Sequence, residues 1–100
     1  MLDQVVFNVT YESNMDKALN IGLEAAKKHT KAFSHEVKSQ PFVRMVFQAS
    51  GVDIIARYYC PAKLVHDISS RITREIYNKI KESDDVDFAY PHIQLVDKKR

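Results

Sequence analysis

Five branched apolar residues recur at every fourth position in the second half of the chain, and this repeat constrains the fold more than any other feature. The residues are Leu64, Ile68, Ile72, Ile76 and Ile80. A spacing of four places them on one side of an α-helix, which we predict over residues 63–82. On its outer side, Asp67, Arg71, Glu75 and Lys79 are expected to pair in succession. The apolar stripe must be covered by another layer of the same domain.

The first part of the chain combines an alternating segment with a helix signal. Over residues 4–11, Val5, Phe7, Val9 and Tyr11 share one side, as in a strand with one buried face. Residues 13–16, Ser-Asn-Met-Asp, follow and supply oxygen side chains for the first amide groups of a helix over residues 14–31. Small residues on the apolar side of that helix would let it lie close to a sheet: Ala18, Gly22, Ala25 and Ala26.

Three more strands are expected. Residues 42–48 and 52–60 alternate in polarity and are joined by a turn that contains Gly51. A last strand is expected over about 88–96, where Pro91 indicates an edge position or a kink. Residues 32–40 form the one long connection, which either carries function or is simply a loop.

This order of elements, strand–helix–strand–strand–helix–strand, is typical of a ferredoxin-like α+β sandwich. In that architecture two helices pack on one face of a four-stranded antiparallel sheet. We expect residues 1–100 to form a single domain with its core over about residues 4–96, because a chain of this length builds one core.

Composition and charge argue against several classes of protein. A net charge of +2 is too weak to indicate nucleic-acid binding by itself. The longest apolar runs are far short of the roughly 20 residues that cross a bilayer, and the first residues do not resemble a secretion signal. The single cysteine, Cys60, cannot form an intramolecular disulfide. We expect a domain that is soluble as it stands and suited to a reducing compartment.

The chain shows no pattern typical of a catalytic or metal site. The candidate ligands Cys60, His29, His35, His66 and His92 lack spacings such as C-x-x-C or H-x-x-x-H, so we expect neither a metal nor a cofactor. Cys60 lies in register with apolar residues, which favours packing in the core over activation as a nucleophile by His66. We therefore predict that the chain is not an enzyme.

Five apolar residues fall on the second side of the predicted strands: Val6, Phe42, Val46, Ile55 and Tyr59. A row of apolar side chains across neighbouring strands predicts a subunit interface, and the alternative is scattered exposure with local cross-strand pairing. Phe42 and Tyr59 could stack on RNA bases. Because no K/R-G-F/Y-G/A-F-V-x-F/Y run accompanies them, we do not expect nucleic-acid binding.

Four segments, in order, resemble the cytoplasmic α/β domain of small-conductance mechanosensitive channels (MscS-type). Residues 52–59, VDIIARYY, resemble its V-D/N-L-x-L-R-x-W/Y strand, and residues 9–18, VTYESNMDKA, resemble its V-x-Y-x-[ST]-D-x-x-K-[AV] junction. Residues 67–76, DISSRITREI, are similar to its S-x-I-N-R-x-I helix, and residues 86–92, VDFAYPH, to its I-x-I-P-F-P-Q closing signature. Ala89 and His92 depart from that signature, and residues 83–85, Ser-Asp-Asp, stand where the family usually has a glycine-containing turn. These departures concern the exit of the chain from the last helix.

The resemblance implies a non-catalytic domain of a membrane channel subunit. In that family seven copies surround a cytosolic vestibule, and portals between subunits admit solutes to the pore. The resemblance implies that the parent protein lies in the cell membrane through a part N-terminal to this chain, and that the chain alone is a monomer or weak oligomer. Two other classes remain open: a ligand-sensing regulatory domain of another transporter, and a free-standing ferredoxin-like RNA-binding module.

Overall fold

The computed structural model describes residues 1–33 and 40–89 of the chain. Strand β1 (Leu2–Val9) leads into helix α1 (Met15–Thr30), and a single 3-10 turn, Lys31–Phe33, follows. Strands β2 (Phe42–Phe47) and β3 (Val52–Tyr59) form a hairpin. A second 3-10 turn, Ala62–Leu64, leads into helix α2 (Val65–Glu82). The strands and helices thus lie within a few residues of the ranges that the sequence predicts.

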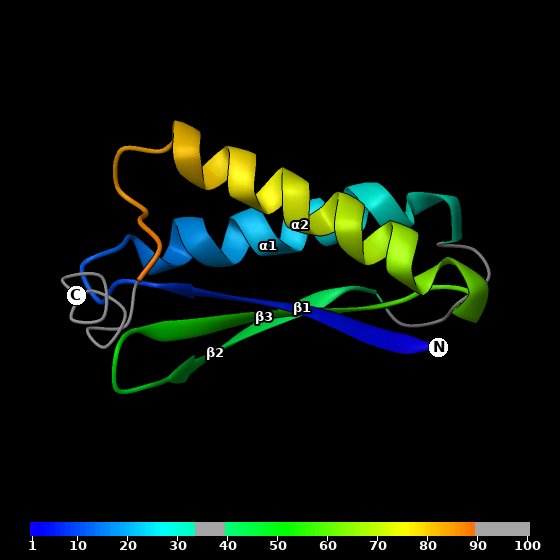
Figure 1. The fold of residues 1–100 in the computed structure, drawn as a ribbon, viewed down its shortest axis with the longest axis horizontal. Coiled ribbons are helices and arrows are strands. Elements are labelled where there is room, and N and C mark those ends of the chain that lie inside the picture. The colour runs from blue at the N-terminus through cyan, green and yellow to red at the C-terminus, as the bar shows by residue number, and fades with distance from the viewer. Residues whose placement is uncertain (34–39, 90–100) are drawn as a thin grey trace, which may run out of the picture.

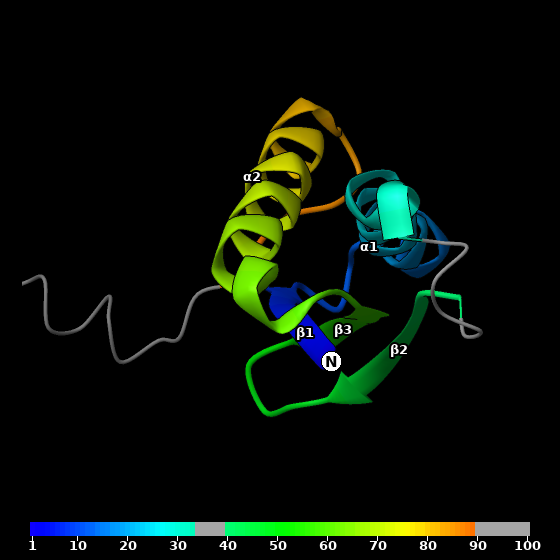
Figure 2. The same ribbon diagram turned by 90° about the vertical axis from the view of Figure 1, so that its right-hand side faces the viewer.

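The three strands form an antiparallel sheet in the order β1-β3-β2, with β3 in the centre. Both helices lie on one face of this sheet (Figure 1), with α2 on the β1 side and α1 on the β2 side when the sheet is viewed end-on (Figure 2). This confirms the α+β class and the placement of two helices on one face. Within the described ranges, neither helix has the length and apolar character needed to cross a membrane.

The core lies between the helices and the sheet, and the two helices enter it differently. Helix α2 buries its isoleucine stripe, Ile68, Ile72, Ile76 and Ile80. Helix α1 buries small residues instead, and a Cβ atom added at Gly22 would lie only 3.2 Å from Cε1 of Phe7. Small side chains therefore let α1 approach the sheet closely, as the sequence predicts.

The junction between β1 and α1 differs in detail from the prediction. Strand β1 ends at Val9, so Tyr11 lies beyond the strand and is half-exposed, not buried on its inner side. Asn14 caps α1, because its side-chain oxygen accepts a hydrogen bond of 3.1 Å from the backbone N–H of Lys17. Ser13 is buried and contacts the chain after α2, where its hydroxyl oxygen accepts a 3.0 Å hydrogen bond from the backbone N–H of Asp87.

One of the ion pairs predicted on the outer side of α2 is present, and another of its residues pairs with a different helix. Arg71 Nε lies 3.1 Å from Asp67 Oδ2, four residues earlier, as predicted. The Oε1 atom of Glu75 instead lies 3.2 Å from Lys28 Nζ and 3.4 Å from His29 Nε2, both on α1. Burial alone would raise the pKa of Glu75, but these two partners outweigh it and lower the pKa. Glu75 therefore joins the two helices.

The chain after α2 returns to the outer edge of β1. Phe88 and Val9 form an isolated antiparallel bridge, flanked by hydrogen bonds of 3.0 Å from Thr10 N–H to the Asp87 carbonyl and from Ala89 N–H to the Asn8 carbonyl. The remainder of the expected last strand, from residue 90 to 96 and including His92, lies outside the described residues. So do residues 34–39 of the long connection, which include His35.

Candidate interaction surface

The face of the sheet opposite the two helices, here called the open face, collects alternate side chains of the three strands. Because side chains alternate between faces along a strand, the strand register assigns each residue to a face. The five residues predicted as an interface all fall on the open face: Val6, Phe42, Val46, Ile55 and Tyr59. The prediction that they share one side of the sheet is therefore consistent with the register. Whether this side contacts a partner stays a prediction.

Ile55 forms the centre of the open face. Val6 lies directly opposite it on β1, and Phe42 and Val46 lie diagonally across on β2, opposite the neighbours of Ile55 at positions 57 and 53. Ile55 is only 8% exposed although no helix lies over it, whereas Val6 is 47% and Phe42 45% exposed. The cross-strand neighbours therefore shield Ile55, and the apolar surface that remains accessible belongs mainly to Val6 and Phe42.

Tyr59 lies apart from this central cluster. It pairs with Leu2 at the end of β1, and Arg57 lies between it and Ile55 along the same face of β3. Leu2 is itself exposed and extends the apolar surface at this end. Leu2 lies outside the strand predicted from residue 4 onward, and its pairing with Tyr59 is the signal that identifies it.

The charges on the open face are predominantly basic. Arg44 lies opposite Ile55, and Arg57 lies between Gln4 and Phe42. The carboxylate of Asp53 accepts hydrogen bonds from Asn8 Nδ2 at 2.8 Å and from Gln48 Nε2 at 3.0 Å. The carboxylate of Asp53 therefore already has hydrogen-bond donors from its own chain. The two arginines are the charged groups that a partner would meet on this face.

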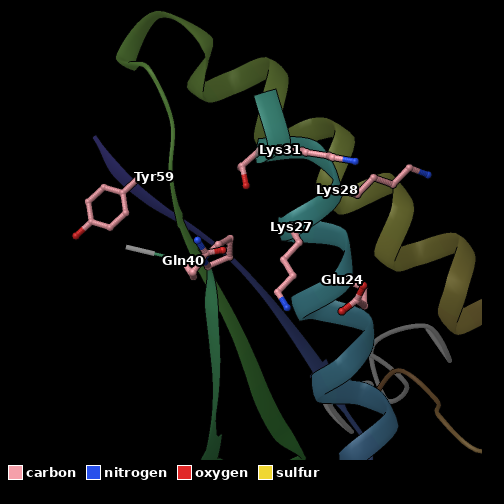
Figure 3. A pocket seen from close by; sticks show the side chains of 8 residues that line it. Glu24, Lys27, Lys28, Lys31, Gln40 and Tyr59 are labelled. Atoms are coloured by element: carbon pink, nitrogen blue, oxygen red, sulfur yellow. The ribbon is translucent and has the colours of Figure 1, made fainter. Parts of the chain in front are cut away.

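A second candidate, a hollow of about 560 Å³ beside the last turn of α1, does not assemble a site. Its lining includes Lys27, Lys28, Lys31 and Tyr59. Lys28 and Lys31 extend away from Tyr59 (Figure 3), and Lys28 is already paired with Glu75. An anion would need converging ammonium groups. The described side chains do not supply that convergence.

Of the groups considered for catalysis and metal binding, the described ones, Cys60, His29 and His66, lie apart from the open face. Cys60 is buried at the end of β3, and burial, together with the charge of Asp3, raises the pKa of its thiol. A buried neutral thiol is a poor nucleophile, while His66 is exposed on the first turn of α2. Among residues 1–33 and 40–89, no group of three or more His, Cys, Asp or Glu side chains is placed to hold a metal ion.

No protein-family model matches the chain, and no curated protein matches its sequence. The interpretation of the open face therefore rests on the residues of this chain and on the resemblance of its four segments.

Proposed function

We propose that this chain is a non-catalytic assembly domain of an MscS-type channel subunit and that its open face contacts a neighbouring subunit or domain. One observation carries the proposal: Val6 and Phe42 are each nearly half exposed around Ile55, on a face that neither helix covers. Apolar side chains clustered on a rigid sheet, with arginines beside them, are typical of the core of a protein–protein interface. A partner would bury them with little further ordering of the backbone.

The placement of the four resembling segments supports the family part of the proposal. Residues 9–18 span the end of β1 and the start of α1, residues 52–59 coincide with β3, and residues 67–76 lie within α2. The closing segment from residue 86 returns to β1 through Phe88. Each motif therefore falls on the kind of element that it occupies in the family. By analogy, we place the domain on the cytoplasmic side of a membrane channel, in a ring of seven copies.

The finer fold belongs to the same proposal. A fourth strand that begins at Phe88 beside β1 would complete the ferredoxin-like sheet, with the closing strand next to β1 and β3 still central. The antiparallel bridge between Val9 and Phe88 supports this arrangement. Such a domain would hold the ring together, frame the portals between subunits and pass changes in packing to the pore. Arg44 and Arg57 would then bias the ions near any portal that they face.

A domain exchange tests the function. The chain is fused in place of the corresponding domain of a small-conductance mechanosensitive channel, and survival of hypo-osmotic shock and single-channel currents are measured. We expect a gated channel from the chimera and loss of assembly from its Phe42→Lys variant. Phe47→Lys is the matched control, because Phe47 is 70% exposed on the same strand but belongs to the helix-covered side. Equal behaviour of the two variants would contradict a role for the open face.

The isolated chain gives a second measurement. Sedimentation velocity over a range of concentrations should show a monomer or a weak oligomer, because one sheet face of this size supplies little of the area that a stable interface buries. Chemical shifts that move with concentration should map to Val6, Ile55 and Phe42. A stable heptamer of the isolated chain would contradict the view that assembly needs further elements of the subunit.

Nucleic-acid binding is the second candidate, because Arg44 and Arg57 lie on the same face as Phe42 and Tyr59. Against it, the centre of the face is occupied by the aliphatic residues Val6 and Ile55, where a base would need an aromatic ring to stack on. Titration with a single-stranded RNA of mixed sequence at several salt concentrations separates the two. Tight binding that weakens steeply with salt would favour the RNA-binding module over the assembly domain.

A further inference from the structure

Arg57, on the central strand of the open face, holds a buried hydrogen-bond donor without an acceptor. The Nε atom of its guanidinium group is shielded from solvent, and within residues 1–33 and 40–89 no group accepts a hydrogen bond from it. The residue as a whole remains partly accessible. A buried N–H group without a partner carries a cost in free energy, because it has lost its hydrogen bonds to water. Arg57 is therefore a place where a partner can supply what the described part of the chain does not.

Asp53, four residues earlier on the same face of β3, differs from Arg57 in this respect. Its two carboxylate oxygens accept hydrogen bonds of 2.8 and 3.0 Å from amide side chains of the same chain. The residues directly opposite Arg57 are Gln4 on β1 and Phe42 on β2. A phenyl ring has no oxygen to accept with, and the Gln4 side chain does not accept from Arg57 Nε. The sheet therefore satisfies the charged group at position 53 and leaves the one at position 57 for a partner.

The surroundings of Arg57 are apolar and accessible. Leu2 and Val6 lie on β1 on either side of Gln4, and Phe42 lies across on β2. All three apolar side chains are exposed. A segment that brings an acceptor to Arg57 must therefore also cover these side chains. Arginine together with exposed apolar groups is typical of the centre of a protein–protein interface.

The shape and charge of the guanidinium group select the acceptor. Its Nε–H and one Nη–H point the same way and match the two oxygens of a carboxylate, whereas a neutral carbonyl oxygen takes only one of them. Arg44 adds a second positive charge to the face, and the negative charge of Asp53 is already engaged. A phosphate also offers two oxygens, but the sugar and base attached to it do not suit aliphatic surroundings. A carboxylate with apolar neighbours meets both requirements.

We propose that the neighbouring protein chain presents an aspartate or glutamate side chain, flanked by apolar residues, to Arg57. Its carboxylate accepts from the unpaired Nε–H and from one Nη–H of Arg57, while the flanking residues cover Val6 and Phe42. Arg44 contributes charge only. This inference rests on the open-face contact proposed above and specifies the chemistry of the partner there.

NMR of the full chain tests the choice of acceptor. The Nε–H signal of Arg57 is followed during titration with 3-methylbutanoate, with 3-methylbutanamide as the matched neutral probe and inorganic phosphate as the anion without an apolar part. We expect the carboxylate to shift this signal downfield more than either control does, and more than it shifts the Nε–H signal of Arg44. Equal effects of the carboxylate and the amide, or equal shifts at the two arginines, would overturn the proposal. A larger effect of phosphate would indicate a phosphate-bearing partner instead.

Lysine variants of the channel chimera separate the geometry of Arg57 from its charge. Arg57→Lys keeps the positive charge but loses the paired N–H groups, so we expect the yield of assembled chimera to fall by roughly tenfold or more. Arg44→Lys is the matched control and should assemble like the parent. Denaturation of the isolated Arg57→Lys chain shows whether the variant is folded.

The outcomes distinguish this inference from the function on which it rests. If both lysine variants assemble normally while Phe42→Lys does not, the open face is in contact but no carboxylate is held by Arg57. If Phe42→Lys also assembles normally, the open-face contact itself is wrong.

Charge exchange identifies the partner residue. Arg57→Glu should prevent assembly of the chimera, because two carboxylates would then meet. Selection of this variant for survival of hypo-osmotic shock should recover second substitutions in which an aspartate or glutamate has become lysine or arginine. Recovery confined to positions that carried no negative charge would refute a carboxylate partner.

Discussion

Ile54 and Ile55 are neighbours on β3, yet the protein buries them in different ways. Ile54 faces the helices and is fully buried. Ile55 faces away from them and is 8% exposed, and among the described residues its cross-strand neighbours lie on the adjacent strands. The helix-covered side is closed by two rigid elements that pack against it, whereas the open face is closed by its own side chains. Ile54 and Ile55 are therefore almost equally buried, but the elements around Ile54 are held more firmly than the side chains around Ile55.

This difference bears on function because a partner can cover the open face, whereas the helices already occupy the other side of the sheet. Val6 and Phe42 shield Ile55 while leaving nearly half of their own surface to solvent. A neighbouring chain could cover these side chains without displacing a helix. The helix-covered side has no such freedom, since its residues are packed between layers at the density of a protein interior.

The largest expected effect separates the two isoleucines. Ile54→Ala should lower the free energy of unfolding by about 2–5 kcal/mol, because the helices and the sheet cannot collapse into the resulting cavity. Ile55→Ala should cost clearly less, because flexible neighbours can move into the space. Chemical denaturation of both variants measures the difference. Equal losses would show that the open face is as rigid as the core.

Val5 and Val6 extend the comparison to β1. Val5→Thr places a hydroxyl group among the buried residues of the helix-covered side and should cost about 1–3 kcal/mol. Val6→Thr exposes its hydroxyl to water and should change the free energy of unfolding by less than about 0.5 kcal/mol. Thermal or urea unfolding checks both values. A large loss from Val6→Thr would contradict the accessibility of that position.

A smaller difference in the free energy of unfolding is expected between variants of Tyr58 and Tyr59. The buried hydroxyl of Tyr58 donates a 2.9 Å hydrogen bond to Asp3 Oδ2. Tyr58→Phe should therefore lower the free energy of unfolding by about 1 kcal/mol. Tyr59→Phe on the open face is the control and should have almost no effect in the isolated chain. If the two variants were equally stable, the Tyr58 hydrogen bond would contribute nothing measurable.

The last expected effect appears only at alkaline pH. Burial, followed by the hydrogen bond to Asp3 and its negative charge, raises the pKa of Tyr58 far above its ordinary value of 10.0. Above pH 10 the unfolded chain loses this proton while the folded chain keeps it, so stability should fall as the pH rises. Unfolding followed between pH 8 and pH 11 should show this decline. Tyr58→Phe should make the decline shallower, whereas Tyr59→Phe should leave it unchanged.

Local sequence patterns predicted most of the helices and strands but not which side chains of separate elements contact one another. The repeat of Leu64 and the four isoleucines identified α2 because a spacing of four maps onto one helix side whatever the helix contacts. The outer side of α2 was predicted less well. Glu75 was expected to pair with residues on its own helix, and it contacts Lys28 and His29 of α1 instead. That choice depends on how the two helices cross, which no local spacing encodes.

The candidate surface shows the same division. Alternation along each strand was enough to assign Val6, Phe42, Val46, Ile55 and Tyr59 to one face, because the side-chain period of a strand is two residues. Only the register between strands, set by pairing over long distances in the sequence, brought three of them around Ile55 and left Tyr59 beside Leu2. The sequence by itself thus determined which side of each element is apolar, since that depends on local periodicity. The tertiary structure decided which of those side chains meet, since that depends on how separate elements align.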